Sequence, residues 1–314
     1  MDKVIEVQNL RKTYPLAKGK ELEAVKGISF DAYEGEIFGI LGPNGAGKTT
    51  TLEIIECLKP QTSGVVAVLG FDNLQFPDEI KKRIGMQLQS SQYLHHLSLS
   101  ELLDLFSSFY NQTADRKALL GLVGLTNKAD EEFANLSGGQ KQRFTIASSL
   151  VHKPDILFLD EPTTGLDPKA RRDMWQLIKK INADGITIVI TTHYMEEAEF
   201  LCHRVAIMDQ GRILEIDEPK KLIDRLSDTT QVSFFTDGEV DQAVFAHLPE
   251  IKKVHANHPK VILEISSLDH ISAIVNMLKQ HNITFYGFTV KTATLEDVYL
   301  RLTGHEYEEG ESDE

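Results

Sequence analysis

The sequence predicts an α/β protein with a mainly parallel sheet, followed by a smaller α+β domain. Two apolar runs, 156–159 and 186–190, have the length and composition of strands that are buried on both faces. A helical pattern around 174–181 separates them, and a third apolar run, 36–41, ends at a Gly-rich segment. Alternating strands and helices of this kind indicate a parallel sheet that is covered by helices.

The segment before residue 75 contains further short strands, at 4–7, near 25–30 and at 65–69. From about residue 98 to residue 151 the pattern is helical, because Leu102, Leu103 and Phe106 recur at helical spacing. We therefore expect a strand-rich first part and a helical insert before the remaining strands of the sheet.

The pattern changes near Leu226. It continues as a strand at 231–235, a helix at 239–247, strands at 252–256 and 260–265, a helix at 268–281, a strand at 283–290 and a closing helix at 294–303. This βαββαβ order is typical of the ferredoxin-like arrangement. We expect domains at 1–225 and 226–304, and a disordered tail at 305–314 because those residues are mostly acidic.

Composition narrows the class of protein. The chain has 314 residues and a net charge of −14, whereas nucleic-acid binders usually present a basic surface; a local basic patch stays possible. Cys57 and Cys202 lie far apart without a CxxC spacing, which fits a reducing compartment. The N-terminus lacks the apolar core of a signal peptide, and no apolar run approaches the ~20 residues of a membrane span. We expect a protein that does not cross a membrane by itself.

Residues 42–49 match the phosphate-loop pattern GxxxxGK[ST]. They are Gly42, Pro43, Asn44, Gly45, Ala46, Gly47, Lys48 and Thr49, and Thr50 follows them in the next helix. The glycines let successive N–H groups face phosphate oxygens, Lys48 reaches the β- and γ-phosphates, and the Thr49 hydroxyl binds Mg²⁺. The alternative is a chance Gly-rich turn, but the segment lies between an apolar strand and a helix, as a phosphate loop must.

Two further strand ends carry polar side chains. The strand 156–159 runs into Asp160 and Glu161, and the strand 186–190 runs through two threonines to His193. Acids after a strand and a single histidine are often structural. In a parallel sheet, however, these ends meet at the carboxyl edge beside the phosphate loop. Asp160 is then placed to hold Mg²⁺ and Glu161 to polarise an attacking water.

A second Gly-containing segment precedes the helical run 141–151. It consists of Leu136 followed by Ser137, Gly138, Gly139 and Gln140. Ser137 with Gln140 fits a capping box that any helix could use. The paired glycines are not needed for capping, and they leave backbone N–H groups free at a helix N-terminus to bind an anion.

The ordered motifs resemble those of the ATP-binding cassette (ABC) family. They are the phosphate loop, LSGGQ, ILFLDEP, TTGLDP and TTH, and the resemblance covers about residues 1–225. It implies a P-loop NTPase cassette with a RecA-like parallel core, an antiparallel β subdomain and a helical subdomain. It also implies two cassettes that hold ATP and Mg²⁺ between the phosphate loop of one and Ser137–Gly139 of the other.

The resemblance assigns further roles. Tyr14 matches the aromatic that stacks on adenine, although it could be a plain edge aromatic. Gln89 matches the glutamine that touches Mg²⁺ and senses the membrane partner, and it is chosen over the nearby Gln87 by its spacing from Gly85. Three other residues match the dimer-communicating loop (Asp167), the γ-phosphate switch (His193) and the catalytic carboxylate (Glu161).

Two kinds of cassette ATPase remain open. One is the motor of a membrane transporter, and the other is a soluble ATPase that acts on nucleic acid or ribosomes. A single phosphate loop, the absence of sustained heptads and the acidic charge favour the first. The segments 191–213 and 294–304 resemble type-2 exporters. This implies an integral membrane subunit and a second copy of this chain as partners, no nucleic acid, and a location on the cytoplasmic face of the membrane.

Overall fold

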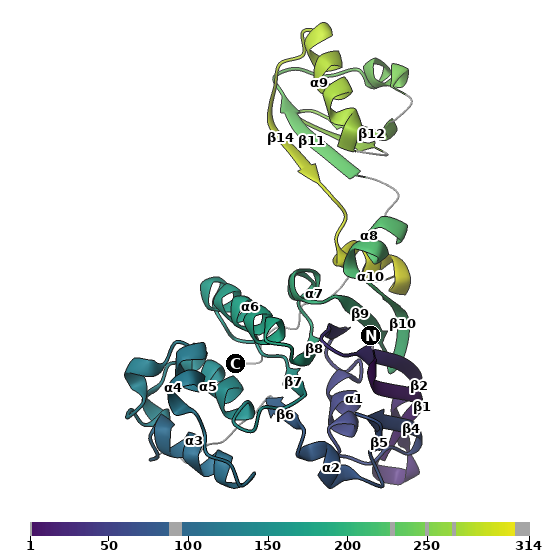
Figure 1. Ribbon diagram of the computed structural model, residues 1–314. Helices are drawn as coiled ribbons and strands as arrows, with labels where there is room; N and C mark the ends of the chain where they lie inside the picture. Colours follow the sequence, from purple (N-terminus) through teal and green to yellow (C-terminus); the bar gives the residue numbers. More distant parts are fainter. Residues whose placement is uncertain (1, 88–95, 227–229, 249–250, 266–267, 305–314) are drawn as a thin grey trace. The chain divides into compact units, whose positions relative to one another are not determined.

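The computed structural model describes residues 2–87, 96–226, 230–248, 251–265 and 268–304 (Figure 1). The chain divides into two compact units, one reaching Pro219 and one beginning at Lys220. The division falls at the start of α8 (Pro219–Leu226). The predicted domain limits 1–225 and 226–304 stay predictions, and the predicted tail lies outside the described residues.

A six-stranded sheet forms the centre of the first unit. Its order is β10-β9-β3-β8-β7-β6. The strands are β3 (Ile37–Leu41), β6 (Ile84–Gln87), β7 (Ile156–Asp160), β8 (Thr187–Thr192), β9 (Arg204–Asp209) and β10 (Arg212–Asp217). All neighbours in this sheet are parallel except the pair β9 and β10. The predicted parallel core is confirmed.

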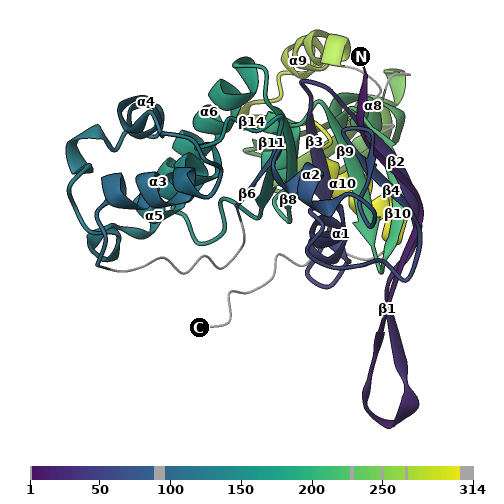
Figure 2. The ribbon, with the colours of Figure 1, turned by 60° about the horizontal axis from the view of Figure 1, so that its bottom comes forward.

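A second, antiparallel sheet has the order β2-β1-β4-β5. It contains β1 (Lys3–Pro15), β2 (Glu21–Tyr33), β4 (Ser63–Val68) and β5 (Phe71–Asp72). Alternate residues of β1, such as Ile5 and Val7, are buried in one apolar core with Phe38 of β3 and Leu52 of α1 (Lys48–Ile55). The end of the β1–β2 hairpin, which contains the turn η1 (Ala17–Gly19), extends beyond the body of the unit (Figure 2). The predicted strand-rich first part is confirmed.

Helices cover the sheets and build the insert. They are α2 (Pro77–Lys81), α3 (Leu99–Ser108), α4 (Arg116–Leu122), α5 (Gly138–Ser149), α6 (Pro168–Ala183) and α7 (Met195–Leu201), with short turns η2 (Thr126–Lys128) and η3 (Phe133–Asn135). The helices α3, α4 and α5 lie together on one side of the unit (Figure 1). Their packing is apolar: Leu102, Leu103 and Phe144 are each fully buried. The predicted helical insert is confirmed.

The second unit contains a four-stranded antiparallel sheet of order β12-β13-β11-β14. Its elements are β11 (Thr230–Thr236), η4 (Gln242–His247), β12 (Ile251–Asn257), β13 (Lys260–Ile265), η5 (Leu268–His270), α9 (Ile271–Gln280), β14 (Phe285–Lys291) and α10 (Leu295–Thr303). The strand and helix order agrees with the prediction, except that the first predicted helix, 239–247, is a six-residue 3₁₀ turn. A 3₁₀ turn suits so short a segment, whose N–H group at Ala243 is already capped by Asp241.

None of the helices in the described part of the chain combines the length and the apolar character that crossing a membrane requires.

Candidate active site

The phosphate loop is folded so that glycine is required at two of its positions. A Cβ atom on Gly42 would collide with the carbonyl oxygen of Met208, and one on Gly47 would lie 2.6 Å from the carbonyl oxygen of Ala24. Gly47 also has a φ of 102°, a conformation that other residues rarely adopt, and it precedes α1 directly. The backbone of this loop can therefore approach an anion closely at the N-terminus of α1.

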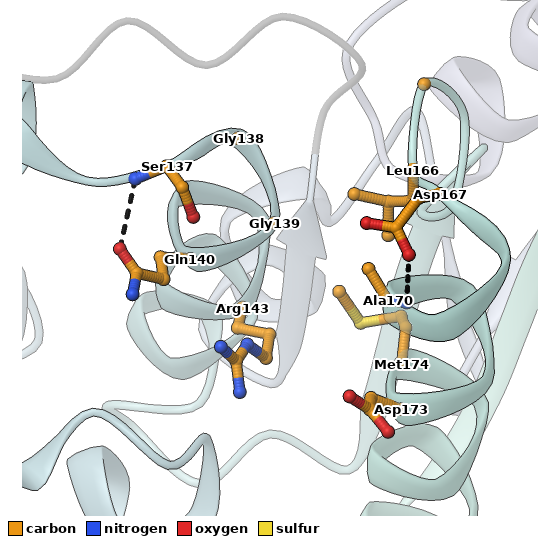
Figure 3. A pocket seen from close by; sticks show the side chains of 11 residues that line it. Ser137, Gly138, Gly139, Gln140, Arg143, Leu166, Asp167, Ala170, Asp173 and Met174 are labelled. Atoms are coloured by element: carbon orange, nitrogen blue, oxygen red, sulfur yellow. Dashed lines mark hydrogen bonds between the residues drawn. The ribbon is translucent and has the colours of Figure 1, made fainter.

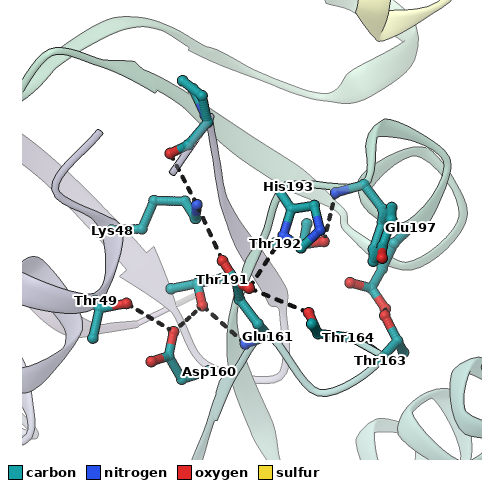
Figure 4. Close-up of polar contacts among 12 residues, drawn as sticks. Lys48, Thr49, Asp160, Glu161, Thr163, Thr164, Thr191, Thr192, His193 and Glu197 are labelled. Carbon is teal, nitrogen blue, oxygen red and sulfur yellow. Dashed lines mark hydrogen bonds and ion pairs between the residues drawn. The ribbon is translucent and has the colours of Figure 1, made fainter. Parts of the chain in front are cut away.

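Lys48 is buried at the first position of α1. Its side chain is 4% exposed, and Nζ donates to the carbonyl oxygens of Gly42 at 2.8 Å and Pro43 at 3.1 Å. Nζ also lies 3.2 Å from Oε1 of Glu161 (Figure 4). Burial lowers the pKa of Lys48, and the charge of Glu161 acts in the opposite direction. The ammonium group is thus held under the loop, where a phosphate group would need a counter-charge.

Asp160 ends β7 and faces two hydroxyl groups. Its Oδ1 accepts a hydrogen bond from Thr49 Oγ1 at 3.4 Å and a short one from Thr191 Oγ1 (Figure 4). Burial raises the pKa of Asp160, while the hydrogen bond from Thr191 lowers it. A hydroxyl group beside a carboxylate supplies oxygen ligands of the kind that Mg²⁺ prefers.

Glu161 follows in a left-handed conformation with a φ of 47°, which is uncommon outside glycine. Its N–H donates to the Thr191 hydroxyl at 3.1 Å, and its Oε2 lies 3.1 Å from Nδ1 of His193 and accepts from the Thr164 hydroxyl at 3.2 Å. Burial would raise the pKa of Glu161, but the hydrogen bond to His193 and the charge of Lys48 outweigh it and hold this pKa at about 2. The carboxylate is therefore ionised at neutral pH.

The structure brings together four of the residues predicted from strand and loop ends, Lys48, Asp160, Glu161 and His193, because β3, β7 and β8 are parallel neighbours. Two hydroxyl residues of this cluster, Thr191 and Thr164, were not predicted. Their signal was their position beside the predicted residues, within TTH and EPTT.

The predicted anion site at α5 lies in a different pocket. Ser137, Gly138, Gly139 and Gln140 line a pocket of about 360 Å³ together with Arg143, Asp167 and Asp173, and its lining includes no residue of the phosphate loop (Figure 3). The Ser137 N–H donates to Gln140 Oε1 at 3.0 Å, so Gln140 caps its own helix. Asp167 caps α6, because its Oδ1 accepts from the N–H groups of Lys169 and Ala170 at 2.9 Å.

One predicted site residue, Tyr14, is in neither of these two places, and another, Gln89, is not described by the structure. Tyr14 is in β1, in the hairpin that leaves the body of the unit, with Nζ of Lys12 at 5.0 Å and Nζ of Lys59 at 5.9 Å from its ring centroid. Both ammonium groups thus lie within the distance of a cation–π contact with the Tyr14 ring. Gln89 lies outside the described residues, whereas the alternative Gln87 is a buried residue of β6.

A phosphate loop before a helix, a buried lysine, and two carboxylates at the carboxyl end of a strand in the same parallel sheet define a P-loop nucleotide-binding ATPase.

Comparison with known proteins gives the family. Residues 25–164 match the model of the family described as ABC transporter. A linearmycin resistance ATP-binding protein of Bacillus subtilis is 35% identical over 96% of this chain and 98% of its own length. A Nod factor export ATP-binding protein of Burkholderia pseudomallei is also 35% identical, over 96% of this chain and 97% of its own length.

Solved structures agree with these relatives. A dimeric bacterial ABC transporter cassette is 32% identical and superimposes with a TM-score of 0.63, covering 68% of this chain and 98% of the cassette. A dimeric cassette in a post-hydrolysis state with ADP and Pi is 31% identical, with a TM-score of 0.62 and coverage of 68% and 98%. The chain belongs to the ABC transporter family. It is an ATP-binding and ATP-hydrolysing subunit, and the predicted resemblance to the export group of this family is confirmed.

Proposed function

We propose that two copies of this chain hydrolyse ATP to energise export through a separate integral membrane subunit. The observation that carries the proposal is the presence of two half-sites on one chain. One half-site holds Lys48, Asp160, Glu161 and His193, and the other is the pocket at Ser137–Gly139. In a dimer with a two-fold axis, each copy would supply the half-site that faces the complementary half-site of the other copy, so two complete sites would form.

In the first half-site we assign a role to each side chain. Lys48 and the loop N–H groups bind the phosphates of ATP, and Tyr14 stacks on its base. Thr49, Asp160 and Gln89 hold Mg²⁺, which neutralises phosphate charge when it is bound. Among the described residues, no group of three or more His, Cys, Asp or Glu could hold a metal ion.

Glu161 is the general base. It stays ionised at neutral pH because of Lys48 and His193, so it can accept a proton from the attacking water. His193 Nδ1 lies 3.1 Å from Glu161 Oε2 and fixes the direction of that carboxylate. We assign His193 to the γ-phosphate as well, and Ser137, Gly138 and Gly139 to the phosphates of the ATP held by the other copy.

The membrane partner is expected to dock beside residues 89–97, on the cytoplasmic face of the membrane. His96 is exposed and Leu97 is half-buried, while residues 89–95 lie outside the described part of the chain. Polar loops with apolar anchors suit such docking. Single cysteines at Ser91 and His95, in a Cys57→Ser background, should crosslink to the membrane subunit with yields that change on adding ATP. Absence of both crosslinks in an active complex would exclude this surface.

The Glu161→Gln variant tests the proposed hydrolysis directly. Turnover of ATP should fall by about a hundredfold or more, as expected for loss of a general base. Light scattering should detect an ATP-bound dimer that the wild type does not accumulate. A matched control is Glu36→Gln, since Glu36 is also a buried carboxylate but accepts from the Tyr33 N–H at 2.8 Å, at the other end of β3. Near-normal turnover of Glu161→Gln would contradict the proposal.

A further inference from the structure

A buried carboxylate outside the cluster around Lys48 links three segments of the chain. Each of these segments carries a candidate site residue. Glu197 lies in α7 with none of its surface exposed. Its Oε1 accepts hydrogen bonds from the Thr163 hydroxyl at 2.8 Å and from the Trp175 indole N–H at 2.8 Å. Figure 4 shows Glu197 beside Thr163, on the side of His193 that faces away from Lys48.

The first donor belongs to the segment between Glu161 and Asp167. Thr163 is fully buried, and the next residue, Thr164, donates to Oε2 of Glu161 at 3.2 Å. The position of Thr163 therefore limits where the hydroxyl of Thr164 can lie, and with it the orientation of the Glu161 carboxylate.

The second donor belongs to α6, the helix that begins at the cap residue Asp167. Trp175 is 8% exposed and its ring stacks on Phe200 of α7, with centroids 5.1 Å apart. If α6 moves as a rigid element, a shift of Asp167 would be passed along the helix to Trp175 and from there to Glu197.

Glu197 is also attached to the His193 segment, because α7 follows it directly. A second contact joins α6 to the His193 segment. The guanidinium carbon of Arg171, in α6, lies 3.9 Å from the ring centroid of Tyr194, and that centroid lies 4.1 Å from the centroid of the His193 ring. The segments of Asp167, Glu161 and His193 thus converge on α7.

The chemistry of a carboxylate suits this junction. Burial raises the pKa of Glu197, and the hydrogen bonds from Thr192, Thr163 and Trp175 oppose it. One oxygen of Glu197, Oε1, satisfies donors from two segments at once. An apolar residue of similar size would fill the space without linking them.

We propose that Glu197 is a positioning residue that couples the Asp167 loop to the Glu161–His193 pair. Contact of Asp167 with the second copy then sets the orientation of the groups that act on ATP. The proposal rests on the roles proposed above for Glu161 and His193 and on the match of Asp167 to the dimer-communicating loop, and it assigns Glu197 no contact with ATP.

The first test separates positioning from binding. Glu197→Ala should lower kcat by about tenfold or more, since small misplacements of catalytic groups are costly. The Kd for ATP should stay within about threefold, because no ATP-binding group is removed. Glu197→Gln keeps an acceptor oxygen for Thr163 and Trp175 and should restore most of the turnover. Trp175→Phe keeps an aromatic ring, although a smaller one, and removes the N–H donor. It should also lower kcat, and it provides a second test if Glu197→Ala does not fold.

The second test measures coupling. Asp167→Asn keeps the helix cap, and its effect on kcat is compared in the wild type and in Glu197→Ala. If Glu197 transmits the effect of Asp167, the loss caused by Asp167→Asn should shrink at least about fivefold in the Glu197→Ala background, as for residues that act as a unit. Glu36, a buried carboxylate elsewhere, gives the control. In the Glu36→Ala background, Asp167→Asn should lower kcat by the same factor as in the wild type.

The coupling would be overturned if Asp167→Asn lowered kcat by the same factor, within about twofold, in the Glu197→Ala background and in the wild type. The effects of independent sites add in free energy, so their factors multiply. Unchanged turnover in Asp167→Asn would overturn it too, since no effect would remain to be transmitted. The proposed function is tested separately by Glu161→Gln: if that variant is inactive while the Glu197 and Asp167 effects multiply, only the role of Glu197 is wrong.

Discussion

Lys48 and Glu161 form a buried ion pair, with Nζ 3.2 Å from Oε1 and side chains only 4% and 8% exposed. The two residues come from two places on the carboxyl edge of the sheet: α1, which follows β3, and the segment after β7, with β8 between the two strands. Lys48 therefore has a carboxylate partner under the phosphate loop, and a bound phosphate would compete with Glu161 for the same ammonium group. A competing buried charge lowers the affinity for an anion.

We expect Glu161→Gln to bind nucleotide more tightly as well as hydrolysing it slowly. The amide removes a negative charge next to the phosphate position and releases Lys48 from the ion pair. The Kd for ADP, measured by titration calorimetry, should fall by about tenfold, a change of about 1.4 kcal/mol. The Glu36→Gln control should leave it unchanged. An unchanged or weaker affinity in Glu161→Gln would show that the ion pair does not compete with nucleotide.

The two half-sites predict complementation between inactive variants. Lys48→Ala damages the phosphate loop, and Ser137→Arg blocks the exposed N-terminus of α5. In a mixed dimer one composite site keeps both intact halves. An equal mixture should recover about a quarter of the wild-type ATPase activity if sites act independently, because half of the random dimers are mixed and each has one good site. Tags on the two variants would demonstrate mixed dimers. If these mixed dimers stayed inactive, one composite site would not be sufficient for ATP hydrolysis.

The parts of the site that were predictable are local in sequence or follow from one topological rule. Residues 42–49 are consecutive in the sequence. Glycine is needed at positions 42 and 47 because a Cβ atom there would collide with a backbone carbonyl oxygen. Asp160 and His193 are far apart in sequence, but both follow buried strands, and parallel strands bring their carboxyl ends together. The alternation of strands and helices was likewise enough to predict the parallel core.

Other features depend on side chains that meet only in three dimensions. Nothing in the sequence pairs Lys48 with Glu161 or Glu197 with Trp175, because such contacts depend on helix packing and rotamers. The 3₁₀ turn at Gln242–His247 was predicted as a helix because its short apolar pattern fits both. The role of Gln140 stays open, since the structure uses its side chain as a helix cap.

A chain that ends at Leu226 should still fold and bind ATP. The apolar core that carries the phosphate loop contains only residues up to Ile216, and the second unit has its own core around Phe234 and Leu263. Circular dichroism should show cooperative unfolding of the shortened chain, and its Kd for ATP should stay within about threefold of the full-length value. A folded but non-binding product would mean that residues beyond 226 contribute to the nucleotide site.

Glu56 is an unusual carboxylate at the end of α1. It is 1% exposed, and neither of its oxygens has a hydrogen-bond partner in the described part of the chain. Burial, together with the negative charges of Asp160 and Glu53, raises its pKa to about 8. Glu56 is therefore mostly protonated in the folded protein at neutral pH, whereas the unfolded chain ionises it near pH 4.3.

This difference predicts a loss of stability as pH rises. Below the unfolded pKa both states are protonated, and the contribution of Glu56 is fully present. Between about pH 4.3 and pH 8 only the unfolded state releases the proton, so the free energy of unfolding falls by up to about 1.4 kcal/mol per pH unit. Glu56→Gln stays neutral and should escape this loss. The amount by which its Tm exceeds that of the wild type should be small at pH 5 and should grow by several degrees between pH 5 and pH 8, since 1 kcal/mol corresponds to about 2–4 °C. As a control, Glu53→Gln removes a neighbouring negative charge that raises the pKa of Glu56 in the folded state. The pKa of Glu56 should then be lower in this variant, and the loss of stability by pH 8 should be smaller. A Tm difference between Glu56→Gln and wild type that is the same at pH 5 and pH 8 would show that Glu56 ionises alike in both states.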